Sequence, residues 1–162
     1  MISGRRHLER AAPDVALARG QVLWRSVTPE RPVVLYGAEL ESPALCLGAY
    51  QHGGHALARG ALEGGRMLLR RRTGGVALQL GPGTVYLAIG LLGPSSMMAC
   101  PPGKLLNRNV RGTLTGLRQL KLPAHYFGRD FVSVERRPAS YVAWREAADG
   151  RALVELFVAV TK

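Results

Sequence analysis

Hydrophobic and polar positions alternate along this chain with two different periods. Apolar residues at helical spacing predict helices over residues 14–25 and 104–120, and a short helix over 56–62. Short apolar runs predict β-strands over residues 33–36, 44–47, 130–136, 139–145 and 151–161. The dipeptide Asp149-Gly150 predicts a hairpin between the last two strands.

A central stretch, residues 68–92, joins a basic cluster to two glycines and two apolar segments. We expect a strand, a turn and a second strand here, with Gly74 and Gly75 at the hinge. Over the whole chain, an early helix is followed by strands, a long helix and a terminal hairpin. This order predicts an α+β fold with a mixed β-sheet covered by helices. A chain of 162 residues is expected to form one domain, residues 1–162, with a core of its own.

The predicted long helix has an apolar face and a basic edge. Leu106, Val110, Leu114 and Leu117 share the apolar face, and Lys104, Arg108, Arg111 and Arg118 form the basic stripe. Gly112 and Gly116 each cost the helix roughly 1 kcal/mol relative to alanine, so tertiary packing must stabilise it. Glycines four residues apart can also mark close packing against a sheet.

The last predicted strand contains one acidic residue in an almost continuous apolar run, Leu-Val-Glu-Leu-Phe-Val-Ala-Val. Glu155 shares a side of the strand with Leu153 and Phe157. A carboxyl group there is paired, protonated or at a sheet edge, because an isolated buried charge is costly. Of these alternatives we favour the edge.

The formal net charge of +11 favours an anionic partner. The candidates are nucleic acid, an acidic carrier domain or nucleotide phosphates, and the alternative is a basic surface without a specific partner. Nucleic acid is the weaker candidate, because no aromatic residues interleave with the basic helix stripe for base stacking.

Neither the cysteines nor the histidines have metal-ligand spacing, so no metal is expected. Cys46 and Cys100 are interpreted as plain thiols. The charged N-terminus does not resemble a signal peptide, and no apolar run reaches the roughly 20 residues of a membrane span. We therefore expect a cytoplasmic protein without a membrane segment.

The residue types around the central glycines suit an anion. Arg70, Arg71 and Arg72 can grip a phosphate or carboxylate, and Gly74-Gly75 lets backbone N–H groups approach it. The alternative is an ordinary turn beside a solvated basic rim.

Three blocks in this sequence resemble motifs of lipoate-protein ligases and octanoyltransferases, and they occur in that family's order. Residues 70–77 are Arg-Arg-Arg-Thr-Gly-Gly-Val-Ala, similar to the family's Arg-Arg-x-Ser/Thr-Gly-Gly-Gly-Ala loop, and Gly83-Thr84 follows. Residues 44–51 resemble the family strand that ends in Gly-x-Tyr-Gln, and residues 128–130 its Gly-Arg-Asn/Asp block. The resemblance spans most of the chain.

The resemblance implies a biotin/lipoate protein ligase-like fold. It also implies that the catalytic domain of the family continues beyond the point where this sequence stops. ATP and lipoate or octanoate would be substrates, no cofactor would be bound covalently, and an acidic lipoyl carrier domain would be the partner. The residues that it assigns to substrate or adenylate binding are Arg70, Arg71, Thr73, Gly74, Gly75, Gly128, Arg129 and Asp130.

Three departures from the family pattern bear on catalysis. Val76 replaces the third glycine of the loop, and Leu80-Gly81 stand where the family commonly has His-Asp. Arg137 stands where the family has its essential lysine. Two hypotheses follow: a lipoate or octanoate ligase or transferase, or a non-catalytic relative that binds a ligand or partner. Loss of the lysine favours the second.

Overall fold

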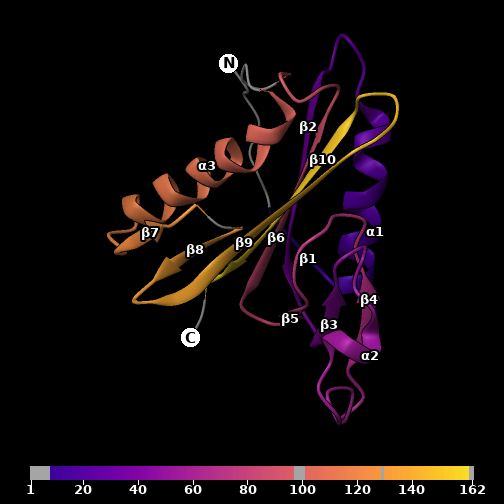
Figure 1. Ribbon diagram of the computed structural model, residues 1–162, viewed down its shortest axis with the longest axis vertical. Helices are drawn as coiled ribbons and strands as arrows, with labels where there is room; N and C mark the ends of the chain where they lie inside the picture. The colour runs from indigo at the N-terminus through magenta and orange to yellow at the C-terminus, as the bar shows by residue number, and fades with distance from the viewer. Residues whose placement is uncertain (1–7, 97–100, 129, 161–162) are drawn as a thin grey trace.

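A seven-stranded β-sheet is the largest element of the fold in the computed structural model, which describes residues 8–96, 101–128 and 130–160 (Figure 1). The strand order is β1-β2-β6-β10-β9-β8-β7, and neighbours run antiparallel except β1 and β2. In that order the strands are Glu9–Ala11, Val33–Leu40, Thr84–Leu91, Ala152–Ala159, Arg137–Glu146, Phe131–Val134 and Ala124–Tyr126. The mixed sheet confirms the predicted α+β class.

A second, three-stranded sheet has the order β4-β3-β5. Its strands are β3 (Ala44–Leu47), β4 (Met67–Arg70) and β5 (Leu78–Leu80), with β3 parallel to β4 and antiparallel to β5. The expected hinge at Gly74-Gly75 is therefore not a hairpin turn. The glycines belong to a loop that passes from one edge of β3 to the other.

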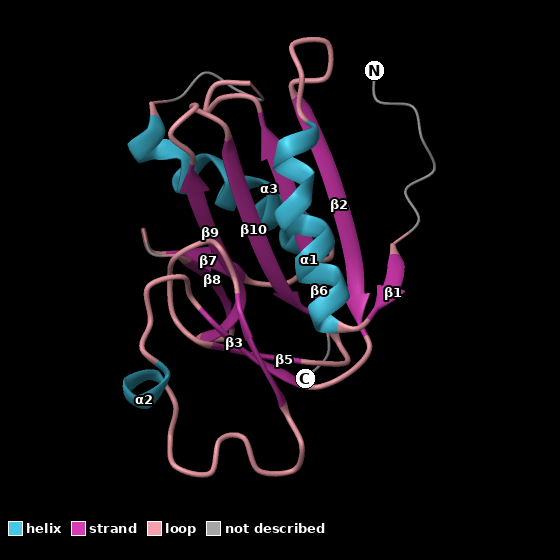
Figure 2. Cartoon of the chain, turned by 90° about the vertical axis from the view of Figure 1, so that its right-hand side faces the viewer, coloured by secondary structure: helices cyan, strands magenta, loops and turns pink. Residues whose placement is uncertain are grey.

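Two helices lie on opposite faces of the large sheet (Figures 1 and 2). Helix α1 (Pro13–Leu23), extended by a 3₁₀ turn at Trp24–Ser26, contacts β2 and β6. Helix α3 (Leu105–Gln119), preceded by a 3₁₀ turn at Pro102–Lys104, contacts β7, β8 and β9 on the other face. In the described part of the chain, no helix is long and apolar enough to cross a membrane.

The structure corrects several predicted elements. The short helix α2 spans Gly53–Ala56 and not residues 56–62. In the loop that follows it, Gly60, Gly64 and Gly65 take positive φ angles, which a helix cannot accommodate. Strands β1 and β7 were not predicted, because three residues carry too little pattern.

Helix α1 packs closely on the large sheet at Gly20. A Cβ on Gly20 would lie 2.0 Å from the hydroxyl oxygen of Tyr86, so only glycine leaves room for that ring. The Tyr86 side chain is fully buried on this face of β6. Its phenol group therefore ends in the protein interior, between α1 and the sheet.

Helix α3 buries the apolar face that its sequence predicts, including Val110 and Leu117. The close packing against a sheet considered above does not occur at the two glycines of this helix. A Cβ on either Gly112 or Gly116 would meet no atom within 4 Å. They face open space, not a packed sheet.

We predict that the protein loses stability at alkaline pH partly through Tyr86. Burial raises the pKa of Tyr86 well above its ordinary value of 10.0. Because the folded pKa is raised, the stabilisation is complete below the unfolded-state pKa and is lost as the pH rises above it, by up to about 1.4 kcal/mol per pH unit. Urea unfolding at pH 9 and 11 should show a smaller loss for Tyr86→Phe than for the parent. The control Tyr50→Phe, at an exposed tyrosine, should follow the parent. Identical losses in all three proteins would contradict this account.

Candidate functional site

The loop formed by residues 71–77 crosses the end of β3 and packs on the segment that follows it. The N–H of Arg71 donates to the carbonyl of Leu47 at 3.0 Å, and the N–H of Ala49 donates to the carbonyl of Thr73 at 2.9 Å. A Cβ on Gly48 would lie only 2.2 Å from the carbonyl oxygen of Gly75. Two of the three sequence blocks that resemble the ligase family therefore meet here.

Arg71 is almost fully buried and holds this loop closed. Its Nε and Nη2 donate to the carbonyl of Gly74 at 3.2 and 2.7 Å, and Nη2 also donates to the carbonyl of Val76 at 2.8 Å. Its Nη1 donates to the carbonyl of Cys46 at 3.3 Å, and the guanidinium lies 5.7 Å from the ring centroid of Phe157. Since the N–H donors are used within the chain, this geometry gives Arg71 a structural role and not the anion-binding role expected from the sequence.

Arg70 lies at the surface beside the same loop. Its Nη1 donates to the carbonyls of Gln51 and Gly48 at 2.6 and 3.0 Å. Among the described residues, no hydrogen bond involves its Nε or Nη2. Arg72, in the loop, is also exposed, and its Nε donates to Oε1 of Gln21 at 3.3 Å. Arg70 and Arg72 therefore keep N–H donors that could reach an anion.

Thr73 connects the loop to the centre of the large sheet. Its hydroxyl donates to Oε2 of Glu155 at 2.5 Å, and the hydroxyl of Tyr86 donates to Oε1 at 2.7 Å. Glu155 is fully buried on β10, which pairs with β6 on one side and β9 on the other. The expectation that Glu155 marks a sheet edge is therefore wrong. The strand is central, and two hydroxyl groups compensate for the burial of the carboxyl group.

Asp130 approaches the loop from the other end of the sequence. Its Oδ2 lies 3.6 Å from the position of a Cβ on Gly75, and its carbonyl accepts a hydrogen bond from the N–H of Val142 at 2.8 Å. Gly75 and Gly128 both have positive φ angles, 92° and 76°, which glycine adopts freely. The structure thus places Asp130, the last residue of the third sequence block, beside the loop. Arg129, assigned to the same block, lies outside the described residues.

A cleft of about 200 Å³ separates β5 from β9 and β10 next to the loop. Leu78 and Leu80 form one wall, and Ala139, Tyr141 and Phe157 form the other. These residues come from three strands far apart in the sequence, so no local sequence pattern groups them. The only sequence signal of this cleft is the apolar content of each of the three strands.

Arg137 is an exposed residue at the start of β9. It does not line the cleft, although Ala139, two residues later on the same side of the strand, does. The structure therefore places Arg137 just beyond the cleft.

Cys46 lies closer to the loop. Burial raises the pKa of Cys46, which keeps its thiol protonated at neutral pH. Cys100 lies outside the described residues.

Comparison with solved structures identifies the fold. A lipoate-protein ligase A bound with ATP superposes with a TM-score of 0.80 at 17% sequence identity, over 99% of this chain and 68% of that one. A putative lipoate protein ligase from Thermoplasma acidophilum with bound lipoic acid gives a TM-score of 0.79 at 16% identity, over 99% and 70%. The protein has the lipoate-protein ligase fold predicted from its sequence blocks.

A third solved structure is a bi-partite lipoate protein ligase from the same archaeon, described with its E2 lipoyl domain. It gives a TM-score of 0.76 at 16% identity, over 96% of this chain and 63% of that one. The chain thus spans less than two thirds of the length of this relative. No protein-family model and no curated protein sequence matches the chain described here.

We predict that the hydroxyl of Thr73 is needed to hold the loop. Thr73→Val keeps the shape but leaves the buried Glu155 with one fewer donor, which should cost about 1–3 kcal/mol of unfolding free energy. Thr73→Ser retains the hydroxyl and should cost less. Urea denaturation of the three proteins measures the difference. Equal stability of the Val and Ser variants would show that the hydrogen bond contributes nothing.

Proposed function

We propose that this protein is a lipoate/octanoate-protein ligase-like protein that binds an acyl chain or acyl-adenylate in the cleft between β5 and β9–β10. The observation that carries the proposal is the cleft of mixed apolar and polar lining that borders the loop of residues 71–77 at Ala77. A cleft that combines apolar side chains with a few polar groups is suited to a fatty acid with an activated carboxyl end. The fold agrees with this assignment but, at 16–17% identity, does not establish it.

The loop supplies the polar end of the proposed site. Arg70 would pair with the carboxylate or phosphate, and Gly74 and Gly75 would bring the backbone close to it. Asp130 would orient the loop from the opposite side. Solved relatives hold ATP or lipoic acid, which supports ATP and lipoate or octanoate as the substrates here.

The macromolecular partner under this proposal is an acidic lipoyl carrier domain. One solved relative is described with an E2 lipoyl domain, and the net charge of +11 favours an acidic partner. The whole chain would act as one ligase-like domain of a cytoplasmic protein.

The second candidate function is ligand binding without turnover. What favours it is Arg137, which the resemblance aligns with the family's lysine. An arginine keeps its proton in a protein, so it can hold an anion but cannot exchange a proton during adenylation. The cleft and the loop serve either function, so binding and transfer need separate tests.

We expect the cleft to be the acyl site. Ala139→Phe should fill the cleft and weaken binding of a non-hydrolysable lipoyl-adenylate analogue at least about tenfold, or about 1.4 kcal/mol. Isothermal titration calorimetry measures the affinity. Ala148→Phe, in the exposed turn after β9, makes the same change away from the cleft and should bind like the parent. Equal weakening in both variants, or in neither, argues against this cleft.

We also expect binding to survive where turnover is slow. Without positioned acid–base catalysis, adenylation should be roughly 10²–10⁴ slower than in an enzyme that has the lysine. The assays are pyrophosphate exchange and mass spectrometry of a lipoyl carrier domain, on the parent and on Arg137→Lys. Rapid carrier modification by the parent would exclude the non-catalytic alternative and the assignment of Arg137 to the lysine position.

A further inference from the structure

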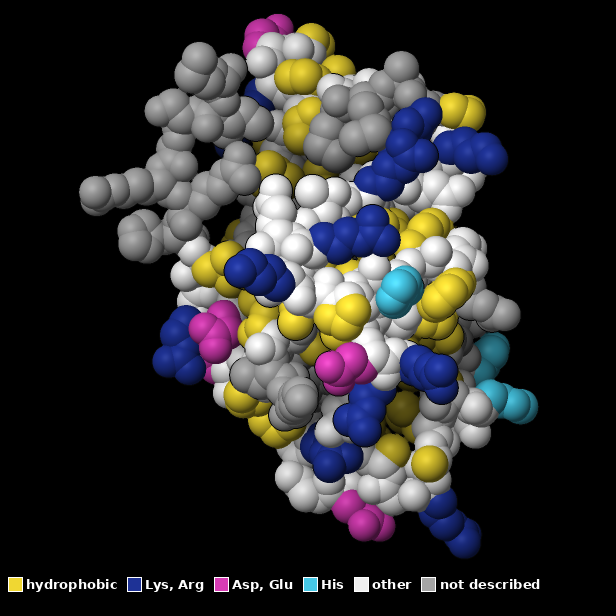
Figure 3. Space-filling model, turned by 90° about the vertical axis from the view of Figure 1, so that its left-hand side faces the viewer, with side chains coloured by type: hydrophobic (Ala, Val, Ile, Leu, Met, Phe, Trp, Pro, Cys, Tyr) yellow, Lys and Arg dark blue, Asp and Glu magenta, His cyan; other side chains and the backbone are white. Residues whose placement is uncertain are grey.

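Tyr141 on β9 is a polar residue in the wall of the cleft between β5 and the large sheet. The other polar side chains there are Gln79 and Thr84. None of the described residues that line the cleft is charged, whereas Lys and Arg side chains are spread over the face of the molecule seen in Figure 3. The cleft can therefore hold a neutral part of a ligand without having to pair a charge.

The hydroxyl of Tyr141 has no hydrogen-bond partner among the described residues. Each of the other tyrosines that is at least partly buried donates to a side-chain oxygen: Tyr36 to Glu9, Tyr86 to Glu155 and Tyr126 to Asn107. A tyrosine hydroxyl that leaves the solvent usually has a partner of this kind. The phenol of Tyr141 is thus a donor that is still available to a ligand.

The strand register places Tyr141 between the cleft and the loop that carries Thr73. Tyr141 lies opposite Phe157 of β10, and both residues line the cleft. Two residues beyond Phe157 on the same face is Ala159, which also lines the cleft. Two residues before Phe157 is Glu155, which accepts the hydrogen bond from Thr73. A ligand tail over Ala159 therefore passes Tyr141 before the head of the ligand reaches the loop.

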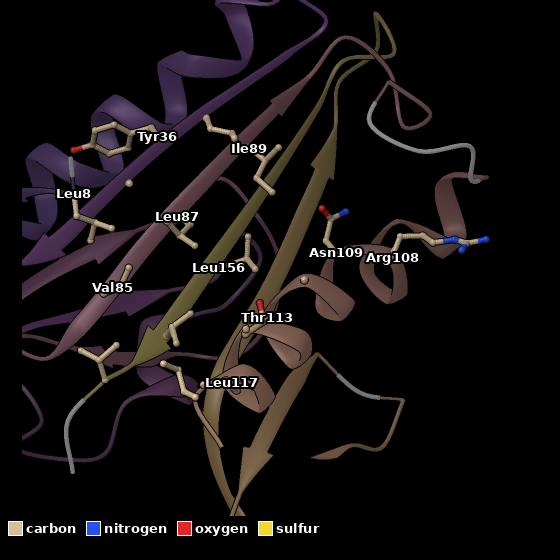
Figure 4. Close-up of a pocket in the computed structure, with 17 residues that line it drawn as sticks. Leu8, Tyr36, Val85, Leu87, Ile89, Arg108, Asn109, Thr113, Leu117 and Leu156 are labelled. Atoms are coloured by element: carbon tan, nitrogen blue, oxygen red, sulfur yellow. The ribbon is translucent and has the colours of Figure 1, made fainter. Parts of the chain in front are cut away.

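The alternate residues of β10 line a different hollow. Leu156 and Val158 point to the opposite face of the sheet, where they line an apolar groove beside α3 (Figure 4). Among the described residues of that groove, the only tyrosine is Tyr36, and its hydroxyl already donates to Glu9. A change at the hydroxyl of Tyr141 therefore acts on the cleft and not on the groove.

Asp130 lies near Tyr141 at the loop end of the cleft. Its carbonyl accepts the N–H of Val142 at 2.8 Å, and its Oδ2 lies 3.6 Å from the position of a Cβ on Gly75. Burial and, after it, the negative charge of Asp130 raise the pKa of Tyr141. The phenol therefore stays protonated at neutral pH and can donate a hydrogen bond.

We propose that the hydroxyl of Tyr141 donates a hydrogen bond to the acyl carbonyl oxygen of an acyl-adenylate whose tail lies in the cleft. The carbonyl is the first polar group after the tail, and it is a neutral acceptor that matches a neutral donor. The inference rests on the proposed function, because it takes the cleft as the acyl site. It adds a ligand-binding residue outside the three sequence blocks, and it holds for binding with or without turnover.

A cycle of two ligands and three proteins tests this hydrogen bond. The ligands are the non-hydrolysable lipoyl-adenylate analogue and a matched compound with a methylene group in place of the acyl carbonyl. Tyr141→Phe removes only the hydroxyl. Isothermal titration calorimetry should show that this variant binds the carbonyl ligand roughly three- to tenfold more weakly than the parent, and the methylene ligand no more weakly. The control Tyr126→Phe removes a hydroxyl that donates to Asn107 outside the cleft, and it should bind both ligands like the parent.

A second readout is the infrared stretching frequency of an isotope-labelled acyl carbonyl in the bound ligand. A hydrogen bond to the oxygen weakens the C=O bond. The frequency should therefore be higher in the complex with Tyr141→Phe than in the complexes with the parent and with Tyr126→Phe. A purely structural role of Tyr141 would weaken the binding of both ligands alike and leave the frequency unchanged.

The outcomes separate this inference from the proposed function. Equal loss of affinity for both ligands in Tyr141→Phe, or no loss for either, overturns the role of the hydroxyl, and the acyl cleft stands if Ala139→Phe still weakens binding. A parent that binds neither ligand, or an Ala139→Phe variant that binds the carbonyl ligand as tightly as the parent, contradicts the proposed function and the inference together.

Discussion

A single buried carboxyl group joins the two sheets of this protein. Glu155 lies at the centre of the large sheet, and its two oxygens accept hydrogen bonds from Tyr86 on the neighbouring strand and from Thr73 in the loop of the small sheet. Burying a carboxyl group is costly unless such bonds satisfy it, so the loop has one favoured position. Gly20 belongs to the same arrangement, because it leaves room for the Tyr86 hydroxyl under α1.

The position of the loop determines the geometry of the candidate site. Glu155 holds Thr73, and Arg71 donates hydrogen bonds to the carbonyls of Gly74 and Val76, which closes the loop. The loop then lies beside Asp130 and borders the cleft between β5 and the large sheet. Buried groups thus position the loop, whereas Arg70 and Arg72 are exposed beside it.

Much of this fold could be predicted from the sequence, because long apolar runs and helical spacing are local signals. The α+β class, both long helices and the ligase-like blocks follow from such patterns. The pairing of strands does not, since a loop with Gly74-Gly75 looks the same whether it turns a hairpin or crosses over β3. The roles of Arg71 and Glu155 were also inaccessible, because their partners are backbone carbonyls and hydroxyl groups up to 82 positions away in sequence.

Hydrogen–deuterium exchange on Glu155→Gln tests most directly whether this carboxyl group holds the loop. A glutamine has one acceptor oxygen, so it can accept from only one of the two hydroxyl groups in the same manner. The account predicts faster exchange of the Ala49 and Arg71 amides, which bond across the loop, with unchanged exchange in β6 and β10 at the centre of the large sheet. Unchanged exchange at the loop amides, or a uniform increase throughout both sheets, would contradict it.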